Sequence, residues 1–348
     1  MELEKRAPRV RQLTEGAERI VALLHEDMTR PDVSIVIPCY NAEEYVGAAI
    51  ESALRQTHAP AEVIVIDDGS EDESLGVIRS FGDRLTWRTG ANRGACHARN
   101  RGLRLASSPF VKFLDADDAL VDDAVETQLA QARKMTDERE IVFGDKVCID
   151  GAGNFLEHVS YRARRKGEDP VVRMLKSNPQ TSLPLHRRRL LVEVDGFDER
   201  LSYGQEYDLH VRLALAGVRF HYMPGEIALI RRHRGKERIT NNDHFQNDPE
   251  DLLRRLQNRE RMIREARSGT LSDEISRLLA LDAWSGGRKA LRKELSGVAQ
   301  RYFDYARALH PQCVAGASRA YRWSVRLLGP VAAERMGAWA RKTKAALS

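Results

Sequence analysis

Residues 110–118 read FVKFLDADD, an apolar run that ends in three carboxylates. The run follows the turn residues 107–109 (Ser-Ser-Pro) and predicts a short buried strand over 110–114. Carboxylates this close repel each other, so a binding partner must offset their charge, and a divalent cation is the usual one. In the alternative interpretation, the carboxylates only stabilise the N-terminus of a helix that starts near Val121.

Strand and helix patterns alternate on both sides of this stretch. Apolar strand patterns lie at 33–38, 62–66, 85–87, 110–114, 141–143 and 227–230. Helical patterns lie at 43–56, 71–80 (with Ser70 as the expected N-cap), 92–105, 121–135 and 204–217. This alternation is typical of βαβ units, so we expect an α/β fold with a Rossmann-like, mainly parallel sheet flanked by helices.

A second carboxylate pair, Asp67 and Asp68, ends the predicted strand at 62–66. Parallel strands end at the same edge of a sheet, where ligands bind, so both carboxylate groups should face one crevice. A nucleotide there would donate base or ribose hydrogens to Asp67 or Asp68, and Asp117 would hold a metal on its phosphates. The chain contains no GxGxxG after the first strand and no GxxxxGK[ST], which argues against dinucleotide and P-loop sites.

The composition indicates a soluble globular protein. Of the 348 residues, 42% are hydrophobic and 31% charged, enough for a sizeable core. The four cysteines are widely spaced, with no CxxC pair, and predict free thiols in a reducing compartment. We expect neither a signal peptide, because the first thirty residues lack an apolar core, nor a membrane span.

The net charge is unevenly distributed along the chain. Residues 1–250 carry a net charge of −6, whereas 251–348 carry +11. We expect an N-terminal amphipathic helix within 1–30, an α/β domain over 31–240 and a basic helical region over 241–348 with turns near 268–269 and 285–287.

The last thirty residues, 319–348, hold 7 basic residues and the single acid Glu334. Six large apolar residues are interleaved with them: Trp323, Leu327, Leu328, Val331, Met336 and Trp339. Such a basic helix can lie on an anionic membrane. In the alternative interpretation, its apolar residues pack on the catalytic domain and its charges are only solvated.

Four motifs occur in a fixed order along the chain: VSIVIPCYN at 33–41, DDGS at 67–70, NRG at 92–94 with ARNRG at 98–102, and FLDADD at 113–118. Together they resemble the motifs of the family 2 glycosyltransferases of the GT-A fold. The resemblance covers about residues 32–235. It implies an inverting, metal-dependent enzyme that uses nucleotide-diphosphate sugars, with Mn²⁺ or Mg²⁺ as the cofactor.

The resemblance also implies site residues. Asp117 becomes a metal ligand, together with His233 of the segment Arg232-His233. The nucleotide would be bound by residues of all four motifs: Pro38, Tyr40, Asn41, Asp67, Asp68, Arg93, Asp115 and Ala116.

Residues 204–209 (GQEYDL) contain the candidate catalytic base. From its place near a helix N-terminus, Glu206 is either a general base or a first-turn acid that only stabilises the helix. The segment resembles the family's Gly-Glu-Asp-Tyr/Trp-Asp-Leu, with Glu206 at the position of the usual Asp base and Gln205 replacing the preceding Glu. Asp208 is the alternative base.

We therefore expect a glycosyltransferase that moves a sugar, by preference from a UDP-sugar, to a glycan, lipid-linked or protein acceptor in surface polysaccharide or glycoconjugate synthesis. Its expected location is the cytoplasm, with peripheral association at the inner face of the membrane. The alternatives are a catalytically inactive scaffold that uses the basic tail, and a sugar nucleotidyltransferase. Nucleic-acid binding is not expected, because the tail carries no recognisable motif.

Overall fold

The computed structural model describes residues 32–232, 248, 250–313 and 319–346, with side chains described as far as Met336 in the last range. The helix expected over 10–28 and the candidate ligand His233 lie outside the described residues.

The chain divides into two compact units. Unit 1 comprises Met1–Arg164, Pro179–Glu206 and Val218–His233, and unit 2 comprises Arg165–Asn178, Tyr207–Gly217 and Arg234–Ser348. Segments 165–178 and 207–217 thus belong to the helical unit, although they lie within the range 31–240 that we expected to form one α/β domain.

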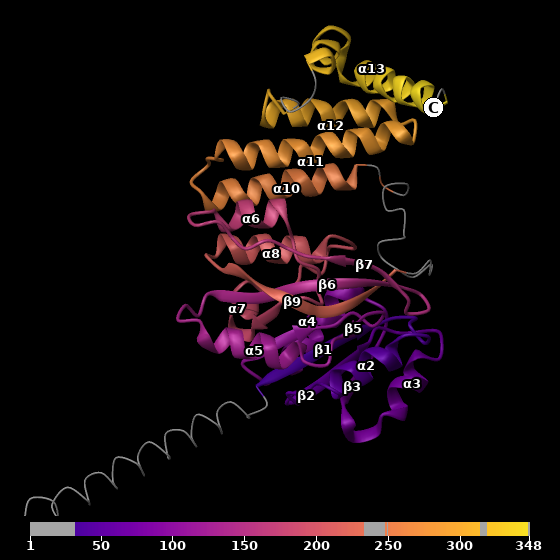
Figure 1. Ribbon diagram of the computed structural model, residues 1–348, viewed down its shortest axis with the longest axis vertical. Helices are drawn as coiled ribbons and strands as arrows, with labels where there is room; N and C mark the ends of the chain where they lie inside the picture. The colour runs from indigo at the N-terminus through magenta and orange to yellow at the C-terminus, as the bar shows by residue number, and fades with distance from the viewer. Residues whose placement is uncertain (1–31, 233–247, 249, 314–318, 347–348) are drawn as a thin grey trace, which may run out of the picture. The chain divides into compact units, whose positions relative to one another are not determined.

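Unit 1 is built on one sheet (Figure 1). Its nine strands, within the described part of the chain, are β1 (Val33–Cys39), β2 (Glu62–Asp67), β3 (Thr86–Thr89), β4 (Phe110–Phe113), β5 (Ala119–Leu120), β6 (Glu140–Asp150), β7 (Phe155–Val159), β8 (Leu185–Arg187) and β9 (Arg219–Arg232). Their order is β3-β2-β1-β4-β8-β6-β9-β5, and β7 pairs with β6.

The parallel strands expected from the sequence are present. Strands β3, β2, β1 and β4 run parallel, as do β6 and β9. The short strands β5, β7 and β8, which no sequence pattern indicated, add antiparallel pairs and curl the sheet beyond β4. The α/β fold class is therefore confirmed.

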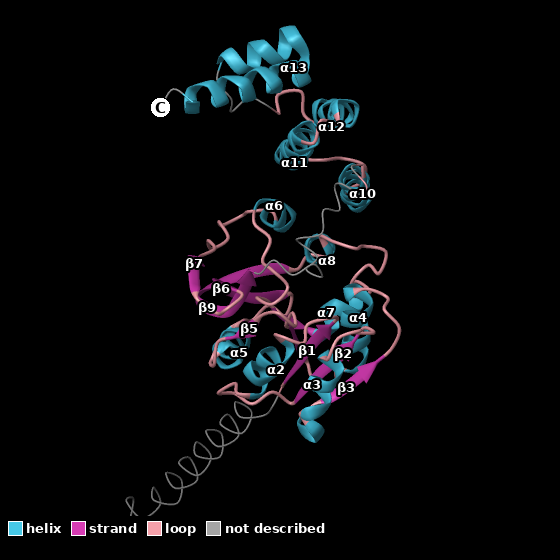
Figure 2. Cartoon of the chain, turned by 90° about the vertical axis from the view of Figure 1, so that its right-hand side faces the viewer, coloured by secondary structure: helices cyan, strands magenta, loops and turns pink. Residues whose placement is uncertain are grey.

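Helices cover both faces of the sheet, and all of them except the last lie within the ranges that the sequence predicted. They are α2 (Val46–Leu54), α3 (Ser74–Ser80), α4 (Ala95–Leu105), α5 (Ala124–Lys134) and α7 (Arg188–Glu193). Because crossovers between parallel strands are right-handed, α2 and α3 cover one face, whereas α4, which leads back across the sheet to β4, covers the other. Figure 2 shows α2 and α4 on opposite sides of β1.

The expected N-cap Ser70 is wrong. Helix α3 begins at Ser74 with Glu73 at the N-cap position. Ser70 instead stays in the turn after β2, where its Oγ accepts a hydrogen bond from the Asn41 backbone N–H at 3.0 Å. The serine connects two loops rather than ending a helix.

A lysine lies inside the core of unit 1. Lys112 on β4 is fully buried, and its Nζ donates to Gln128 Oε1 at 2.8 Å and to the Leu183 carbonyl at 3.2 Å. Both partners are neutral, so no carboxylate offsets the loss of hydration. Burial therefore lowers the pKa of Lys112 to about 7.

We expect the variant Lys112→Met to change how stability depends on pH. The pKa of Lys112 is about 7 in the folded protein and 10.5 in the unfolded chain. At pH values between the two, Lys112 is protonated in the unfolded chain but neutral in the folded protein. Raising the pH within this range therefore increases the free energy of unfolding of the wild type. The melting temperature of the wild type should therefore rise relative to that of Lys112→Met between about pH 7 and pH 9. The exposed Lys134→Met serves as the control, and an equal difference at every pH would contradict this prediction.

Unit 2 is helical. Besides most of α8 (Gln205–Leu215), it contains α6 (Pro170–Lys176), α10 (Asp251–Ala266), α11 (Asp273–Arg292), α12 (Ser296–Leu309) and α13 (Arg319–Ala346). Leu256, Trp284, Tyr302 and Phe303 are among the residues of its buried core. Figure 2 shows α11 and α12 side by side.

The turn expected at 285–287 is wrong, because these residues lie within α11. A Cβ atom on Gly286 would lie 2.5 Å from Tyr302 Cε1, and one on Gly287 would lie 2.6 Å from Phe303 Cε1. The two glycines therefore let the aromatic rings of α12 approach the α11 backbone closely. The turn expected at 268–269 is present, with positive φ at both residues.

Candidate active site

The loops that follow β1, β2 and β4 lie at one edge of the sheet. Cys39 of β1 is in register with Asp67 of β2, and Val36 of β1 with Phe113 of β4, both in parallel pairs. The Asp67-Asp68 pair and the Asp115–Asp118 segment therefore follow the two parallel strands that flank β1 and lie at the same edge of the sheet, as the sequence predicted.

The carboxylates of Asp67 and Asp68 organise the backbone around them. Asp67 accepts hydrogen bonds from the Ser70 N–H and the Thr89 hydroxyl. Asp68 accepts from the backbone N–H groups of Arg93 and Gly94, the latter at 2.7 Å, at the start of α4. Burial raises the pKa of Asp68 against the effect of these hydrogen bonds.

The turn after β2 requires a glycine. Gly69 has φ +79°, and a Cβ atom there would lie 2.8 Å from the backbone nitrogen of Asn92 and 2.9 Å from the carbonyl oxygen of Gly90. Turn 67–70 and loop 90–94 thus pack backbone to backbone. Two of the motifs that define the family resemblance therefore form one structural element.

The three carboxylates after β4 have different surroundings. Asp118 is buried, with Oδ2 accepting from Ser182 Oγ at 2.9 Å and Oδ1 from the Arg231 N–H at 3.0 Å. Burial, together with the charges of Asp117 and Asp115, raises the pKa of Asp118 well above its usual range. Asp115 and Asp117 are only half-buried, so they are the two that a ligand can reach.

Arg99 joins Asp115 to the start of α8. Its buried guanidinium donates to Asp115 Oδ1 at 2.7 Å and to Gln205 Oε1 at 2.6 Å, and it lies over the Phe197 ring. Gln205 also donates from Nε2 to the carbonyls of Leu201 and Ser202. A glutamate at position 205 could accept from Arg99 but could not donate to these carbonyls, which gives a physical reason for the glutamine.

Glu206, the next residue, is half-buried near this ion pair. Burial raises the pKa of the Glu206 carboxyl, and the charge of Asp115 adds to the effect, whereas the Arg99 guanidinium opposes it. A carboxylate whose pKa is raised toward neutrality is a more effective proton acceptor than an exposed glutamate.

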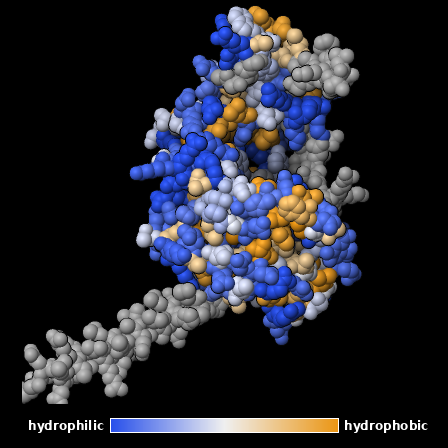
Figure 3. All heavy atoms as spheres, in the orientation of Figure 1, coloured by the Kyte–Doolittle hydropathy of each residue, from blue (hydrophilic) through white to orange (hydrophobic). Residues whose placement is uncertain are grey.

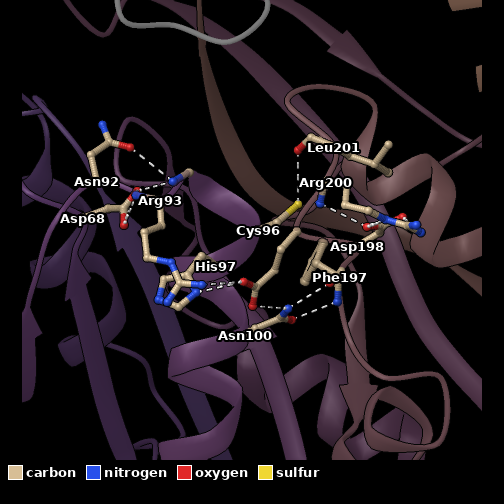
Figure 4. Close-up of polar contacts among 12 residues, drawn as sticks. Asp68, Asn92, Arg93, Cys96, His97, Asn100, Phe197, Asp198, Arg200 and Leu201 are labelled. Carbon is tan, nitrogen blue, oxygen red and sulfur yellow. Dashed lines mark hydrogen bonds and ion pairs between the residues drawn. The ribbon is translucent and has the colours of Figure 1, made fainter.

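A second polar cluster surrounds the N-terminus of α4 (Figure 4). His97 Nδ1 lies 2.9 Å from Glu199 Oε2, and Asn100 Nδ2 lies 3.1 Å from Glu199 Oε1. The exposed guanidinium of Arg93 lies 3.6 Å from the same carboxylate. Hydrogen bonds and charges from these neighbours lower the pKa of Glu199 despite its partial burial, so the carboxylate stays ionised and holds Arg93 near the α4 N-terminus.

The remaining predicted residues occupy separate positions. Pro38 lies in β1, Tyr40 and Asn41 follow it in the β1–α2 loop, and Ala116 is buried between Asp115 and Asp117. Asp208 belongs to unit 2, where its Oδ2 accepts from Arg212 Nε at 2.7 Å across one helical turn.

The side chains of this site could hold a metal ion only if a bound ligand also coordinated it. In the part of the chain that the structure describes, no group of three or more His, Cys, Asp or Glu side chains could hold a metal ion alone. Asp118 is buried, whereas Asp117 is half-buried, so the Asp117 carboxylate is accessible to a metal ion that a bound ligand also coordinates. Mg²⁺ commonly binds through one or two carboxylates plus substrate phosphates, and Asp117 fits that pattern.

Comparison with known sequences identifies the family. The profile of the family described as Glycosyl transferase family 2 matches residues 34–190, which include the first three strands and the Asp115–Asp118 segment. Residues 34–190 therefore match glycosyltransferase family 2.

Relatives agree with this family. The chain is 35% identical over 196 residues to an uncharacterized glycosyltransferase of Rickettsia bellii, covering 53% of this chain and 27% of that protein. It is 31% identical over 195 residues to the chondroitin synthase of Escherichia coli (54% of this chain, 27% of that protein). It is also 33% identical over 211 residues to the succinoglycan biosynthesis protein ExoU of Rhizobium meliloti (54% of this chain, 58% of that protein). The chain thus spans less than two thirds of the length of each of these relatives.

Solved structures confirm the GT-A fold. The S. aureus TarS 1-349 structure superposes with a TM-score of 0.64 at 20% sequence identity, covering 82% of this chain and 83% of that one. No helix among the described residues is both long and apolar enough to cross a membrane.

The sequence did not reveal the residues that connect the site. Arg99 lies in a motif that we quoted, but its partners are 16 and 106 residues away. Ser182, which holds Asp118 and accepts from the Asp115 N–H at 3.2 Å, lies in a segment without a recognisable pattern. Periodicity gives no signal for such contacts, because it reports only which side of an element is buried.

Proposed function

We propose that this glycosyltransferase transfers a sugar from a nucleotide-diphosphate sugar to an acceptor hydroxyl with inversion at the anomeric carbon. The observation that carries the proposal is the Arg99 network, which ties Asp115 at the sheet edge to Gln205, the residue before Glu206. One buried guanidinium thus bonds both the proposed donor-binding carboxylate and the residue that precedes the candidate base.

In the proposed reaction, Glu206 accepts the proton of the acceptor hydroxyl while the acceptor oxygen attacks the anomeric carbon. The bond between that carbon and the diphosphate oxygen breaks, and its electron pair leaves with the nucleoside diphosphate. One base suffices, because attack from the opposite face inverts the centre in a single step, unlike the two carboxylates of a glycosidase.

Asp117 would hold a divalent metal ion, Mn²⁺ or Mg²⁺, together with the phosphates of the donor, and the ion would supply positive charge for the leaving diphosphate. Asp115, which forms an ion pair with Arg99, would face the ribose or the sugar. Arg93 would contribute a guanidinium from the α4 N-terminus, where backbone N–H groups also favour anions.

The donor and the pathway are also proposed. TarS has been solved with UDP-GlcNAc and with UDP, which supports a UDP-sugar. The relatives named for chondroitin and succinoglycan synthesis support a role in polysaccharide synthesis with a glycan, lipid-linked or protein acceptor. The four cysteines are buried and form no disulfide with one another, which is consistent with a reducing compartment, and we propose a location at the inner face of the cell membrane.

A thermal-shift screen of nucleoside diphosphates, each with and without Mn²⁺, tests the donor site. Ligands that bind only the native state raise the melting temperature, by a few degrees at about a hundred times Kd. We expect a shift with UDP that requires the metal. No shift with any nucleoside diphosphate would contradict the proposal and favour an inactive scaffold.

A further inference from the structure

The first segment of α13 exposes an unusual set of side chains. Gly329 has non-helical φ and ψ angles and precedes Pro330, so the segment Arg319–Leu328 ends at a break. Tyr321 and Val325 of this segment pack against the core of unit 2. The inward side of the segment is therefore already covered.

The only acid of α13 also faces inward. Glu334 is 5% exposed and accepts hydrogen bonds from Trp284 Nε1 at 3.1 Å, from Arg288 Nε at 2.5 Å and from the Tyr321 hydroxyl. Its charge is thus compensated within unit 2. No acidic residue occurs from 305 to 333, so the outer side of the segment carries positive charge alone.

Large apolar side chains lie on this outer side. Trp323 is 60% exposed and Leu327, one helical turn further, is 72% exposed, with Leu328 beside it at 52%. Single exposed apolar residues are ordinary, but Trp323 and Leu327 lie four positions apart on one side of the helix and form a short apolar strip, and Leu328 adds a third exposed apolar side chain at the end of the segment.

Three arginines border the strip. Arg319, Arg322 and Arg326 are exposed and recur at positions i, i+3 and i+7, which places them on one side of the helix. The guanidinium of Arg326 lies 6.0 Å from the centre of the Trp323 ring. We name the six residues the arginine–tryptophan face: Arg319, Arg322, Trp323, Arg326, Leu327 and Leu328. In Figure 3, hydrophobic and hydrophilic residues lie next to each other at the top of the view, where Figure 1 labels α13.

We propose that the arginine–tryptophan face docks on the anionic surface of a lipid bilayer. An exclusively positive border complements anionic headgroups, and tryptophan and leucine beside it can enter the boundary between headgroups and acyl chains. The strip is too short to span a bilayer, so the helix lies in the plane of the membrane. Docking gives a physical basis to the proposed location at the membrane, and it does not depend on catalysis.

Sedimentation of the full chain with lipid vesicles tests the docking. We expect binding to vesicles of phosphatidylcholine with about 30% phosphatidylglycerol, little binding to pure phosphatidylcholine, and release when salt rises from about 0.1 M to about 1 M, because the Debye length falls to about 3 Å. Equal binding to both kinds of vesicle, or none to either, would overturn the proposal.

Two double variants and a control assign the binding to this face. Arg319→Gln/Arg326→Gln should weaken binding by about 25-fold, because each basic residue near an anionic surface contributes about fivefold. Trp323→Ser/Leu327→Ser should also release the protein. Phe155→Ser/Leu156→Ser removes two exposed apolar residues from β7 and should leave vesicle binding unchanged. Circular dichroism of all three variants checks that each is folded.

Light scattering separates the membrane from a protein partner. If the wild type is a dimer that Trp323→Ser/Leu327→Ser dissociates, the face is an interface between two copies and the proposal is wrong. The vesicle assay contains neither donor nor acceptor, so its failure would leave the proposed transferase reaction intact. Conversely, loss of the metal-dependent shift with UDP would leave vesicle binding unaffected.

Discussion

Replacing Glu206 by Gln is expected to lower kcat by a factor of about 10² to 10⁴ while leaving donor binding unchanged. The glutamine side chain would fill the same space but could not accept the proton of the acceptor hydroxyl. The measurement is the rate of sugar transfer at saturating donor, together with calorimetric binding of the nucleoside diphosphate and Mn²⁺.

The pH profile gives this prediction a second readout. Glu206 must be ionised to act as a base, and burial raises its pKa above the usual 4.5. Activity of the wild type should therefore fall as pH falls through that raised pKa, and this acid limb should disappear from the residual activity of Glu206→Gln.

Asp208→Asn is the matched comparison, since Asp208 is ion-paired with Arg212 one turn away. We expect this variant to retain most of its transfer activity. If Asp208→Asn abolished transfer while Glu206→Gln did not, the assignment of the base would be reversed.

Replacing Asp117 by Ala is expected to reduce turnover about a thousandfold and to abolish the metal-dependent thermal shift with UDP. A metal ion supplies several kcal/mol of charge stabilisation in such reactions, and about 4 kcal/mol corresponds to a factor of 10³ in rate. Since Asp115 is ion-paired with Arg99 and Asp118 is buried, we expect neither neighbour to replace Asp117.

The thermal shift separates the two variants, because Glu206→Gln should keep the metal-dependent shift that Asp117→Ala loses. Asp123→Ala removes an exposed carboxylate just beyond the same segment and is the control. A metal-dependent shift of full size in Asp117→Ala would show that another residue holds the metal.

Much of unit 1 could be predicted from local sequence. Strands over 33–38, 62–66 and 110–114 are short apolar runs that end in turn or acidic residues, and the structure contains each within about one residue. Strands β7 and β8 could not be predicted, because β7 is exposed along most of its length and β8 has only three residues. Neither has a pattern of alternating burial for periodicity to detect.

The helices of unit 2 could also be predicted only in part from local sequence. The sequence indicated long helices after residue 248, but Gly286 and Gly287 suggested a turn where α11 continues. Glycine favours turns in isolation, yet here the contact of Tyr302 and Phe303 with the helix backbone decides the conformation. Likewise, Val331 packs against the core of unit 2, whereas Trp323 and Leu327 of the same helix are exposed, a difference that the sequence alone did not indicate.

The sequence by itself determined which residues are candidates for the chemistry: the acidic ends of β2 and β4, Arg93, and the Gln205-Glu206 pair. Only the tertiary structure decided which contacts these residues make. It buried Asp118 against Ser182, placed Arg99 between Asp115 and Gln205, and turned Trp323 outward. The physical reason is that residue type and spacing act over one or two turns of chain. A buried guanidinium, by contrast, takes its partners from wherever the packed fold brings carboxylate and amide oxygens within about 3 Å.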